Sequence, residues 1–571
     1  MIVEDNDKIA DIFNHYFNTI TDSLNIPKWT NGHKLNGNEN LENIVDYFSE
    51  HPSILAIKQK FPNLHFSFRK VNTEEVCKVV RSLNVSKSVG GKIPVRSLKL
   101  AEAQCAPILT SLFNDALETG IFPSELKLAD IVPCHKKDAT TDKSNFRPVS
   151  LLPTISKVFE RLMANQMLNF LDSFLSKFLC GFRKGHSTQN ALLNMLRRWQ
   201  HHLSKGEKVG ALLMDLSKAF DCLPHELLLA KLDAYGFNSE ALKLMHSYLS
   251  ERKHRVRISS SFSDWLTATS GVPQGSILGP ILFNIFINDM FIIFHEDDIC
   301  NFADDNTLSS FGEDLDIVHS KLMHSTKLIL IWFNVNSLVA NPAKFQVIFP
   351  GSPSSNISIF IDGAIIESSD VVNLLGVLID DKLSFYPHIS EISNKANNKI
   401  KALMRIRNML SQTKRDLIYN TFIMSPYNYC PLIWMFCCKG AHTLINKIHY
   451  RALKARFSIF SESFESLLAK SNTIKIHDKN INLMLTEVFK SLKQLGPQIS
   501  HDIFQKSDFA YELRNGIPLV IPNLKSINSF DFRATMTWNK LPVEIKNSNT
   551  LGEFRRHLDR TSVDCRCHLC R

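Results

Sequence analysis

The stretch NFADDNTLSSFG, residues Asn301–Gly312, places two aspartates side by side at the end of an apolar run. The flanking residues, 298–303 and 306–311, predict two strands joined by a tight turn. Adjacent carboxylates repel each other, so the pair needs either solvent around the turn or a positive partner. An Asp-Asp pair alone is more typical of a solvated turn, because aspartate is a common turn residue. A third acid at the same place is needed to predict a metal site.

The run ALLMDLSKAFD supplies a third acid, because Asp215 ends another apolar strand expected within residues 208–217. If this strand neighbours the first two, Asp215 and Asp304 can hold two Mg²⁺ ions roughly 4 Å apart, with Asp305 close by. Hard divalent cations prefer oxygen ligands, which explains carboxylates here rather than His or Cys. The sequence therefore predicts a metal site of Asp215, Asp304 and Asp305 for two Mg²⁺ ions, with Mn²⁺ as the alternative.

The wider pattern predicts an α+β protein. The chain has 571 residues, of which 44% are hydrophobic, enough for several domains or one polymerase-sized assembly. Helical signals dominate residues 61–205 and the residues beyond 390, whereas strands and helices alternate between 206 and 350, which indicates an antiparallel sheet. The first sixty residues predict a helix followed by a flexible polar connector, 31–43.

Charge and composition favour a nucleic-acid partner over a membrane. From Ile392 to Arg456 the chain has twelve Lys or Arg and a single acid, Asp416, which suits a polyanion, although a solvated lysine-rich surface is the alternative. The most apolar stretch, 279–294, contains polar residues and predicts a buried helix running into a strand. The twelve cysteines show no disulfide framework and the N-terminus is acidic, so we expect a reducing compartment.

Five sequence blocks follow one another in order. They are NFRPVSLLPTISKVFERLM, GFRKGHSTQNAL, LLMDLSKAFD, GVPQGSILGP and NFADD. Together they closely resemble the successive blocks of reverse transcriptases from non-LTR, LINE-type (jockey-like) retrotransposons, over about residues 115–400. The resemblance implies an RNA-directed DNA polymerase that extends a primer 3′-hydroxyl with dNTPs on an RNA template by two-metal nucleotidyl transfer.

The resemblance also implies a right-hand fold of fingers, palm and thumb. The expected domains are an N-terminal helical extension (1–60), fingers (61–205), a palm with the catalytic site and a primer-grip hairpin (206–390), a basic helical thumb (391–470) and a C-terminal region of unknown role (471–571). The expected partners are the RNA template, a DNA primer or target DNA, and dNTPs, with no membrane. The nucleus and the cytoplasm are the expected compartments.

In the palm, the resemblance assigns Phe220 to stacking under the incoming sugar, where it would exclude a 2′-hydroxyl. Without the resemblance, Phe220 reads as a core aromatic. Gly271, Pro273, Gln274 and Gly275 match the loop that lies against the template and the incoming nucleotide, and glycines allow close backbone approach there. Alone, GVPQGS reads as an ordinary Pro-Gly turn.

Three basic side chains have implied roles at the triphosphate. Lys136 and Arg147 match the pair that grips it, although adjacent Lys137 could replace Lys136; an ammonium and a guanidinium both suit phosphate oxygens. Lys344 matches the lysine near the leaving pyrophosphate, where it could act as a general acid. Without the resemblance, Lys136 and Arg147 would be interpreted as surface charges.

Several further residues receive simpler interpretations. Arg183 and Lys184 are expected to contact the template backbone, while Ser187 or Thr188 caps the following helix. We interpret Asp221 as a helix cap. A second Asp-Asp pair, 380–381, lies in the hairpin that resembles the primer grip, and we expect solvated turn residues there.

The basic segment falls where the thumb is expected, and Lys395, Lys399 and Arg405 lie along one predicted helix, where they could follow a duplex backbone.

The chain ends in CRCHLCR, which offers four ligands, Cys565, Cys567, His568 and Cys570. A zinc knuckle needs ligand pairs separated by a loop, whereas these four crowd into six residues. We therefore expect a disordered tail, with zinc binding as the less favoured alternative.

Two other functions compete with the polymerase. One is a catalytically silent RNA-binding ribonucleoprotein component derived from such an element, which an altered set of palm acids would favour. The other is a nuclease or phosphatase, which explains neither GVPQGS nor Phe220. Related elements usually carry an upstream endonuclease, and its absence here predicts a truncated or partial reading frame.

Overall fold

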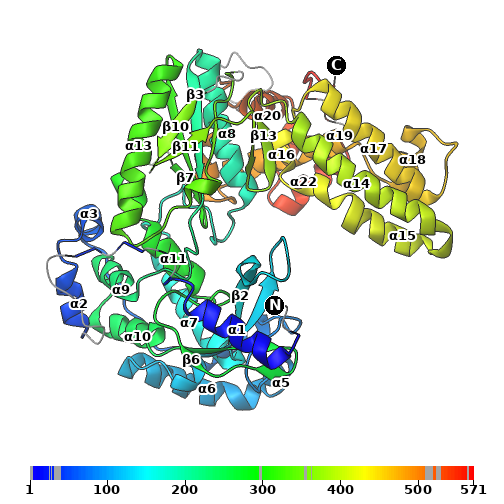
Figure 1. The fold of residues 1–571 in the computed structure, drawn as a ribbon. Helices are drawn as coiled ribbons and strands as arrows, with labels where there is room; N and C mark the ends of the chain where they lie inside the picture. Colours follow the sequence, from blue (N-terminus) through cyan, green and yellow to red (C-terminus); the bar gives the residue numbers. More distant parts are fainter. Residues whose placement is uncertain are drawn as a thin grey trace. The chain divides into compact units, whose positions relative to one another are not determined.

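The computed structural model describes residues 4–22, 24, 26–27, 29–30, 40–294, 299–352, 357–361, 363–507, 518–522, 529–561, 563 and 565–570. The chain forms two compact units, each assembled from three segments. Unit 1 comprises Met1–Phe182, Leu216–Glu296 and Leu328–Asn341; unit 2 comprises Arg183–Asp215, Asp297–Lys327 and Pro342–Arg571. Both contain helices and strands (Figure 1), so the predicted α+β class is confirmed. The predicted connector lies mainly outside the described residues.

Unit 1 is mostly helical around one mixed sheet. Its helices are α1 (Asn6–Asn18), α2 (Leu41–Tyr47), α3 (Pro52–Lys60), α4 (Thr73–Ser82), α5 (Val95–Leu100), α6 (Glu102–Thr119), α7 (Thr154–Leu171), α9 (His225–Ala234), α10 (Ser239–Leu249), α11 (Gly279–Ile287) and α12 (Met290–Ile293). Its strands are β1 (Leu128–His135), β2 (Phe146–Leu151), β4 (Lys253–Ile258), β5 (Ser261–Phe262) and β6 (Leu266–Thr267).

The sheet of unit 1 has the order β2-β1-β4-β5, with β6 also pairing β4. β1 pairs β2 antiparallel and β4 parallel. Helix α1 packs on β4, and its apolar residues Ala10, Phe13 and Phe17 join Ile131 and Val256 in a small core. This packing fits the 3.6-residue spacing of the three side chains on one helix face.

The apolar stretch 279–294 forms the buried helix α11, as predicted, but a second helix, the partly buried α12, follows it where a strand was expected. Its polar residues are paired inside unit 1: Asn284 Nδ2 donates to Gly181 O at 2.9 Å, and Asp289 forms a fully buried ion pair with Lys231 at 2.6 Å. A hydrogen-bonded charge pair of this kind belongs to a protein interior. None of the helices in the described part of the chain combines the length and hydropathy needed to cross a bilayer.

Unit 2 contains a second sheet and most of the C-terminal helices. Its strands are β3 (Lys208–Met214), β7 (Ile299–Phe302), β8 (Asp305–Gly312), β9 (Gln346–Ile348), β10 (Ser358–Ile361), β11 (Ala364–Glu367), β12 (Val371–Leu374) and β13 (Val377–Asp380). Its helices are α8 (Thr188–Lys205), α14 (Tyr386–Ile406), α15 (Gln412–Ile418), α16 (Pro431–Trp434), α17 (Lys439–Phe457), α18 (Phe464–Ser471), α19 (Ile476–Leu492), α20 (Phe530–Asn539), α21 (Val543–Lys546) and α22 (Leu551–Asp559); α13 (Leu315–Val335) begins in this unit.

The sheet of unit 2 is antiparallel, as the strand signals predicted, and its strands have the order β7-β8-β3-β9. Strand β3 is covered on both faces (Figure 1). On one face, Val209, Ala211 and Leu213 share a core with residues of α8. On the other face, Gly210 leaves no room for a Cβ, which would lie 2.7 Å from Val318 of α13. This burial explains why β3 reads as an almost continuous apolar run.

Candidate active site

Three of the predicted acids lie at the ends of adjacent strands in unit 2. The last paired residues of β3 and β8 are Met214 and Asn306, and Asp215 and Asp305 are the next residue beyond this pair on each strand. Asp304 occupies the turn between β7 and β8. Asp215 and Asp304 are partly exposed and Asp305 is exposed. The fold therefore places these three aspartates at one end of the antiparallel sheet, and their role as metal ligands stays a prediction.

Two buried asparagines support the turn that carries Asp304. Asn301 Nδ2 donates to Ala303 O at 2.7 Å and to Asn306 Oδ1 at 2.9 Å, and Asn306 Nδ2 donates to Asp304 O at 3.3 Å. Ala303 has a φ of 60°, a sparsely populated conformation for a residue with a Cβ. These bonds hold the turn in that conformation. The sequence motif contained both asparagines, but it did not indicate their role.

Lys344 lies beside the Asp215 carboxylate, and its expected role at the leaving pyrophosphate stays a prediction. It ends the short helical turn Pro342–Lys344 just before β9, and its Nζ lies 2.6 Å from Asp215 Oδ2. The three aspartates do not gather their oxygens as tightly as metal ligands would: among the described residues, the single group of three or more ligand atoms within 4.8 Å of one another lies elsewhere, at the C-terminus. The Lys344 ammonium instead balances the charge of Asp215.

In unit 1, the GVPQGS loop is wedged between two backbone segments. Gly271 has a φ of 77°, and a Cβ there would lie 2.7 Å from Phe220 O; Gly275 has a φ of 122°, and its Cβ would lie 2.6 Å from Ser150 O. Ser150 N also donates to Gln274 O at 2.7 Å. The close approach and the backbone angles therefore both require glycine.

The interpretation of Asp221 as a helix cap is wrong. Helix α9 follows Pro224 and has no side-chain cap, while Gln274 Nε2 donates to both oxygens of the Asp221 carboxylate, to Oδ1 at 2.9 Å and to Oδ2 at 3.0 Å. Burial raises the pKa of Asp221 to about 6, against the opposing effect of the Gln274 hydrogen bonds. Asp221 therefore orients the Gln274 side chain.

Glu160 is a buried acid beneath this loop that sequence reasoning missed. Its carboxylate is fully buried and accepts the backbone N–H of Ile277 at 2.6 Å and the Tyr248 hydroxyl at 3.2 Å. Burial raises its pKa above the ordinary value. Glu160 anchors the end of the GVPQGS loop to α7.

The Phe220 ring is packed against the core on one face and is partly exposed. It stacks on Phe283 at a centroid distance of 4.6 Å and meets the exposed Phe182 edge-on at 5.7 Å. The residue is partly exposed. One side of the ring thus belongs to the core, as the simpler interpretation held, while the exposed part remains accessible to a ligand.

Arg147 and Lys136 lie on one hairpin, β1–β2. Arg147 pairs with Cys134, and Lys136 N donates to Asn145 O at 2.8 Å, which extends the ladder by one residue. Side chains alternate between the two faces of a strand, so Lys136 is on the same face of the hairpin as Cys134 and Arg147. The same alternation assigns Lys137 to the opposite face. Both predicted basic residues are exposed.

Comparison with known proteins agrees with this arrangement. Residues 134–379, which run from β1 to β13, match the family model of the reverse transcriptase (RNA-dependent DNA polymerase). These residues are therefore similar to a reverse transcriptase domain. Among curated proteins, it is 29% identical to the RNA-directed DNA polymerase from mobile element jockey of Drosophila melanogaster over 68% of this chain and 43% of the relative. It is 26% identical to the probable RNA-directed DNA polymerase from transposon BS of the same fly, over 68% and 44%.

A third relative is the probable RNA-directed DNA polymerase from transposon X-element of D. melanogaster, 27% identical over 66% of this chain and 43% of its own length. The matches thus cover less than half of the length of these curated relatives. They confirm the resemblance to non-LTR reverse transcriptases that the sequence blocks suggested.

Within the matched residues 134–379, the predicted cap before α8 is confirmed. Ser187 is the N-cap residue, and its hydroxyl accepts Asn190 N at 3.3 Å. Arg183 is partly buried and Lys184 is exposed immediately before this helix. The template contact expected of both remains a prediction.

The interpretation of Asp380 and Asp381 as solvated turn residues is wrong. They are 5% and 8% exposed, and the Asp380 carboxylate accepts the backbone N–H groups of Ser384 at 3.0 Å and Phe385 at 2.7 Å. Asp381 N donates to Asp370 O at 2.9 Å. Asp380 therefore stabilises the turn between β13 and α14, and this second pair differs from Asp304–Asp305 in its role.

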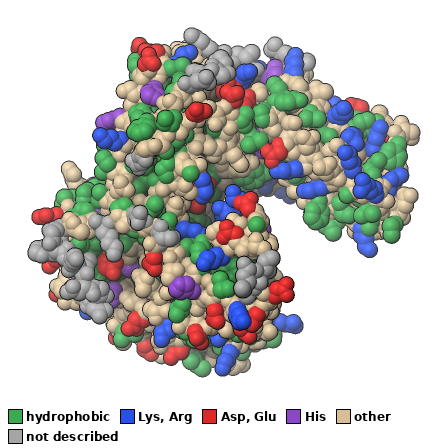
Figure 2. Space-filling model, viewed as in Figure 1, with side chains coloured by type: hydrophobic (Ala, Val, Ile, Leu, Met, Phe, Trp, Pro, Cys, Tyr) green, Lys and Arg blue, Asp and Glu red, His purple; other side chains and the backbone are tan. Residues whose placement is uncertain are grey.

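The basic segment that follows the matched residues forms α14, α15 and α17 of unit 2. Its exposed members are Lys395, Lys399, Lys401, Arg405, Lys414, Lys439 and Lys447, and Lys and Arg side chains gather over these helices in Figure 2. Others are structural: Arg456 forms an ion pair with the single acid, Asp416, at 2.8 Å and lies over the Tyr419 ring. The exposed set forms a positive surface on these helices.

Proposed function

We propose that this chain is an RNA-directed DNA polymerase of a non-LTR retrotransposon. It extends a DNA primer on an RNA template with dNTPs, and its fold is a right hand whose fingers, palm and thumb follow the boundaries predicted from the sequence. The observation that carries the proposal is the placement of Asp215, Asp304 and Asp305 at one end of a sheet within the matched domain. The proposal includes the RNA template and the DNA primer or target DNA as partners. It also includes the nucleus and the cytoplasm as the compartments.

The donor set fits Mg²⁺. The three side chains at this end of the sheet are carboxylates with exposed or partly exposed positions, and hard divalent cations prefer such oxygen ligands. Asp215, Asp304 and Asp305 would hold the ions. Bound there, they supply charge neutralisation of the triphosphate and activation of the primer hydroxyl.

The other side chains of the proposed site bind and orient the nucleotide and the template. Lys136 and Arg147 present their charges from one hairpin face, which suits the oxygens of a triphosphate. Gln274, oriented by Asp221, lies in the loop assigned to the template and the nucleotide. Lys344, which lies next to Asp215, carries a proton that it could donate to the departing pyrophosphate.

Primer extension tests the proposal. Purified full-length chain should extend oligo(dT) on poly(rA) with Mg²⁺ and dTTP. Asp304→Ala should lower the rate on the order of 100- to 1000-fold or more, since the charge-stabilising groups of active sites carry effects of this size. Asp316→Asn, at an exposed position in the first turn of α13, is the control and should extend normally. Tight RNA binding by a parent chain that extends no primer would favour the silent ribonucleoprotein component instead.

A further inference from the structure

The C-terminal segment 565–570 is folded, so the expectation of a disordered tail is wrong. Cys565 is 2% exposed and Cys567 is fully buried in the core of unit 2. Arg533 of α20 donates to Cys565 O at 3.4 Å and to Arg566 O at 2.8 Å. Cys570 N donates to Cys567 O at 3.2 Å, which closes the turn.

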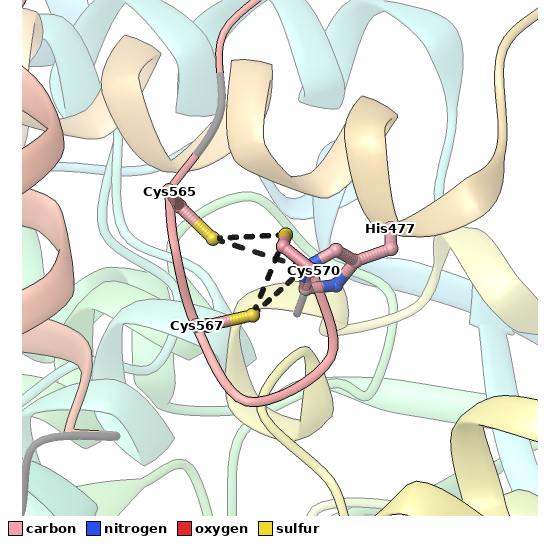
Figure 3. A group of neighbouring side chains, drawn as sticks. All are labelled: His477, Cys565, Cys567 and Cys570. Atoms are coloured by element: carbon pink, nitrogen blue, oxygen red, sulfur yellow. Dashed lines mark hydrogen bonds between the residues drawn. The ribbon is translucent and has the colours of Figure 1, made fainter.

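The three cysteines of this segment meet a histidine that is far away in the sequence. His477 is the second residue of α19, 88 residues before Cys565, and Figure 3 shows its ring facing the three sulfur atoms. One ligand atom from each of the four side chains lies within 4.8 Å of all the others. The four-ligand set therefore exists, but its histidine is not the one in the cysteine motif.

His568 is excluded by its own hydrogen bond. Its Nε2 donates to Cys437 O at 2.9 Å, and it is absent from the group of converging ligand atoms. The prediction failed here because it weighed only ligands that are close in sequence.

The distances between the ligand atoms fit one tetrahedral ion. Cys570 Sγ lies 3.5 Å from Cys565 Sγ and 3.6 Å from Cys567 Sγ, and His477 Nε2 lies 3.3 Å from Cys567 Sγ and 3.9 Å from Cys565 Sγ. Metal bonds of about 2.3 Å to sulfur and about 2.0 Å to nitrogen give tetrahedral edges of about 3.8 Å between sulfurs and about 3.5 Å between sulfur and nitrogen. A disulfide needs a separation of about 2.05 Å, so the sulfurs are unbonded.

The surroundings also suit a thiolate site. Leu569 N donates to Cys567 Sγ at 3.4 Å, and a backbone N–H near a sulfur stabilises its anionic form. Three of the four ligand residues are buried and Cys570 is exposed. Three thiolates and one imidazole in a tetrahedron favour zinc over harder cations.

We propose that Cys565, Cys567, Cys570 and His477 bind one structural Zn²⁺ ion. All four tetrahedral positions are taken by protein, which is typical of structural rather than catalytic zinc. The ion joins the end of the chain to the first turn of α19, and so fastens the C-terminal segment onto unit 2. This proposal does not depend on the polymerase function.

Metal analysis tests the site directly. Full-length chain without a polyhistidine tag, purified without added chelator, should contain about one zinc per molecule by plasma mass spectrometry. His477→Gln and Cys570→Ser should both lose the metal; Cys570 is exposed, so its serine variant keeps the packing. His568→Gln and Cys438→Ser are matched controls that should retain zinc. Absence of zinc in the parent, or loss in His568→Gln but not in His477→Gln, overturns the assignment.

Cobalt substitution and thermal melting give independent readouts. Co²⁺ bound in place of zinc should show the thiolate-to-metal absorption and the strong visible bands of a tetrahedral site, and Cys570→Ser should weaken the thiolate absorption. A zinc chelator should lower the Tm of the parent but leave that of His477→Gln unchanged, because folding and metal binding are linked. An equal fall of the Tm in the parent and in His477→Gln, or cobalt spectra typical of an octahedral site, would contradict the proposal.

Discussion

Phe220 and Asp221 are neighbours in the chain, but their side chains meet different partners. The Phe220 ring has one face on Phe283 and stays partly exposed, whereas the Asp221 carboxylate accepts hydrogen bonds from the Gln274 amide. A substitution at Phe220 should therefore change what the enzyme accepts, while one at Asp221 should change how stability depends on pH.

Phe220→Ala should relax the choice of sugar. Without the ring there is room for a 2′-hydroxyl, so the ratio of kcat/KM for dTTP to that for UTP should fall at least about 10-fold, or about 1.4 kcal/mol. The ratio is measured in single-nucleotide extension and does not depend on the amount of folded enzyme. Phe182→Ala removes the neighbouring exposed ring and should leave the ratio unchanged; an unchanged ratio in Phe220→Ala would remove its assigned role.

Asp221→Asn should alter the pH dependence of stability. Burial raises the pKa of Asp221 from 3.8 to about 6, so the folded chain holds this proton more tightly than the unfolded chain. The free energy of unfolding of the parent therefore falls as the pH rises from about 4 to about 6, and stays lowered above that range. Asparagine does not ionise, so Asp221→Asn does not lose stability in this way. Its free energy of unfolding should therefore rise relative to that of the parent across this pH range, by at most about 3 kcal/mol.

The Tm values of both chains, measured between about pH 4 and pH 7, check this prediction. Gln274→Ala is the companion variant: its hydrogen bonds lower the pKa of Asp221, so their loss should move the window to higher pH. Parallel Tm curves for the parent and Asp221→Asn would contradict the account of Asp221.

The role of a residue was predictable where the residues that determine its position lie within the same short motif. Asp215, Asp304 and Asp305 follow strands that the local pattern reveals, and Gly271 needs its positive φ within a short loop. The partner of Asp380 is close in sequence, yet the backbone N–H groups that bury it become available only in the folded turn. Asp221 was misread for another reason, because its partner Gln274 is 53 residues away in the sequence.

At the scale of elements, the β1–β2 hairpin separates two lysines that the sequence could not distinguish. Lys136 continues the ladder opposite Asn145 and shares a face with Arg147, and Lys137 is an exposed neighbour that forms an ion pair with Asp138 at 3.7 Å. A two-residue period is enough to assign opposite faces to adjacent side chains.

Lys136→Ala and Arg147→Ala should therefore weaken the use of dNTP. Losing a charge-assisted hydrogen bond to phosphate costs about 1.5–3 kcal/mol, which corresponds to a fall in kcat/KM of about 10- to 100-fold. Lys137→Ala is the matched control and should change kcat/KM by less than about 3-fold. A larger effect at Lys137 than at Lys136 would reverse the assignment of the two lysines. Steady-state extension with varied dTTP provides the measurement.

The elements themselves were largely predictable. The strands β3, β7 and β8 and the Pro-started helix α9 lie where the patterns placed them, because apolar periodicity depends on burial of one face. The order β7-β8-β3-β9 was not predictable in full, since strand pairing depends on segments more than a hundred residues apart.

At the scale of the whole molecule, the positive surface over α14 and α15 is a candidate for duplex binding. A triple substitution of Lys401, Arg405 and Lys414 by alanine removes three exposed charges from the segment expected to be the thumb. If each contacts a phosphate, the slope of log K against log salt should become shallower by about 2–3, since each contact contributes about 0.9.

Equilibrium binding of an RNA–DNA duplex at several salt concentrations measures this slope. The matched control replaces Lys60, Lys92 and Lys243, three exposed lysines of unit 1, and should leave the slope nearly unchanged. If both triple variants change the slope equally, the attraction is a general effect of net charge rather than a property of these helices.

The antiparallel sheet of unit 2 also constrains how the chain can fold while it is being synthesised. Strand β3 ends at Met214 and its partner β9 begins at Gln346, which is 346 − 214 = 132 residues later. At about 5–20 residues per second, β3 leaves the ribosome roughly ten seconds before that partner exists. During this interval an apolar strand presents an unpaired edge, a template for aggregation. Production of this chain should therefore depend on chaperones that shield nascent chains.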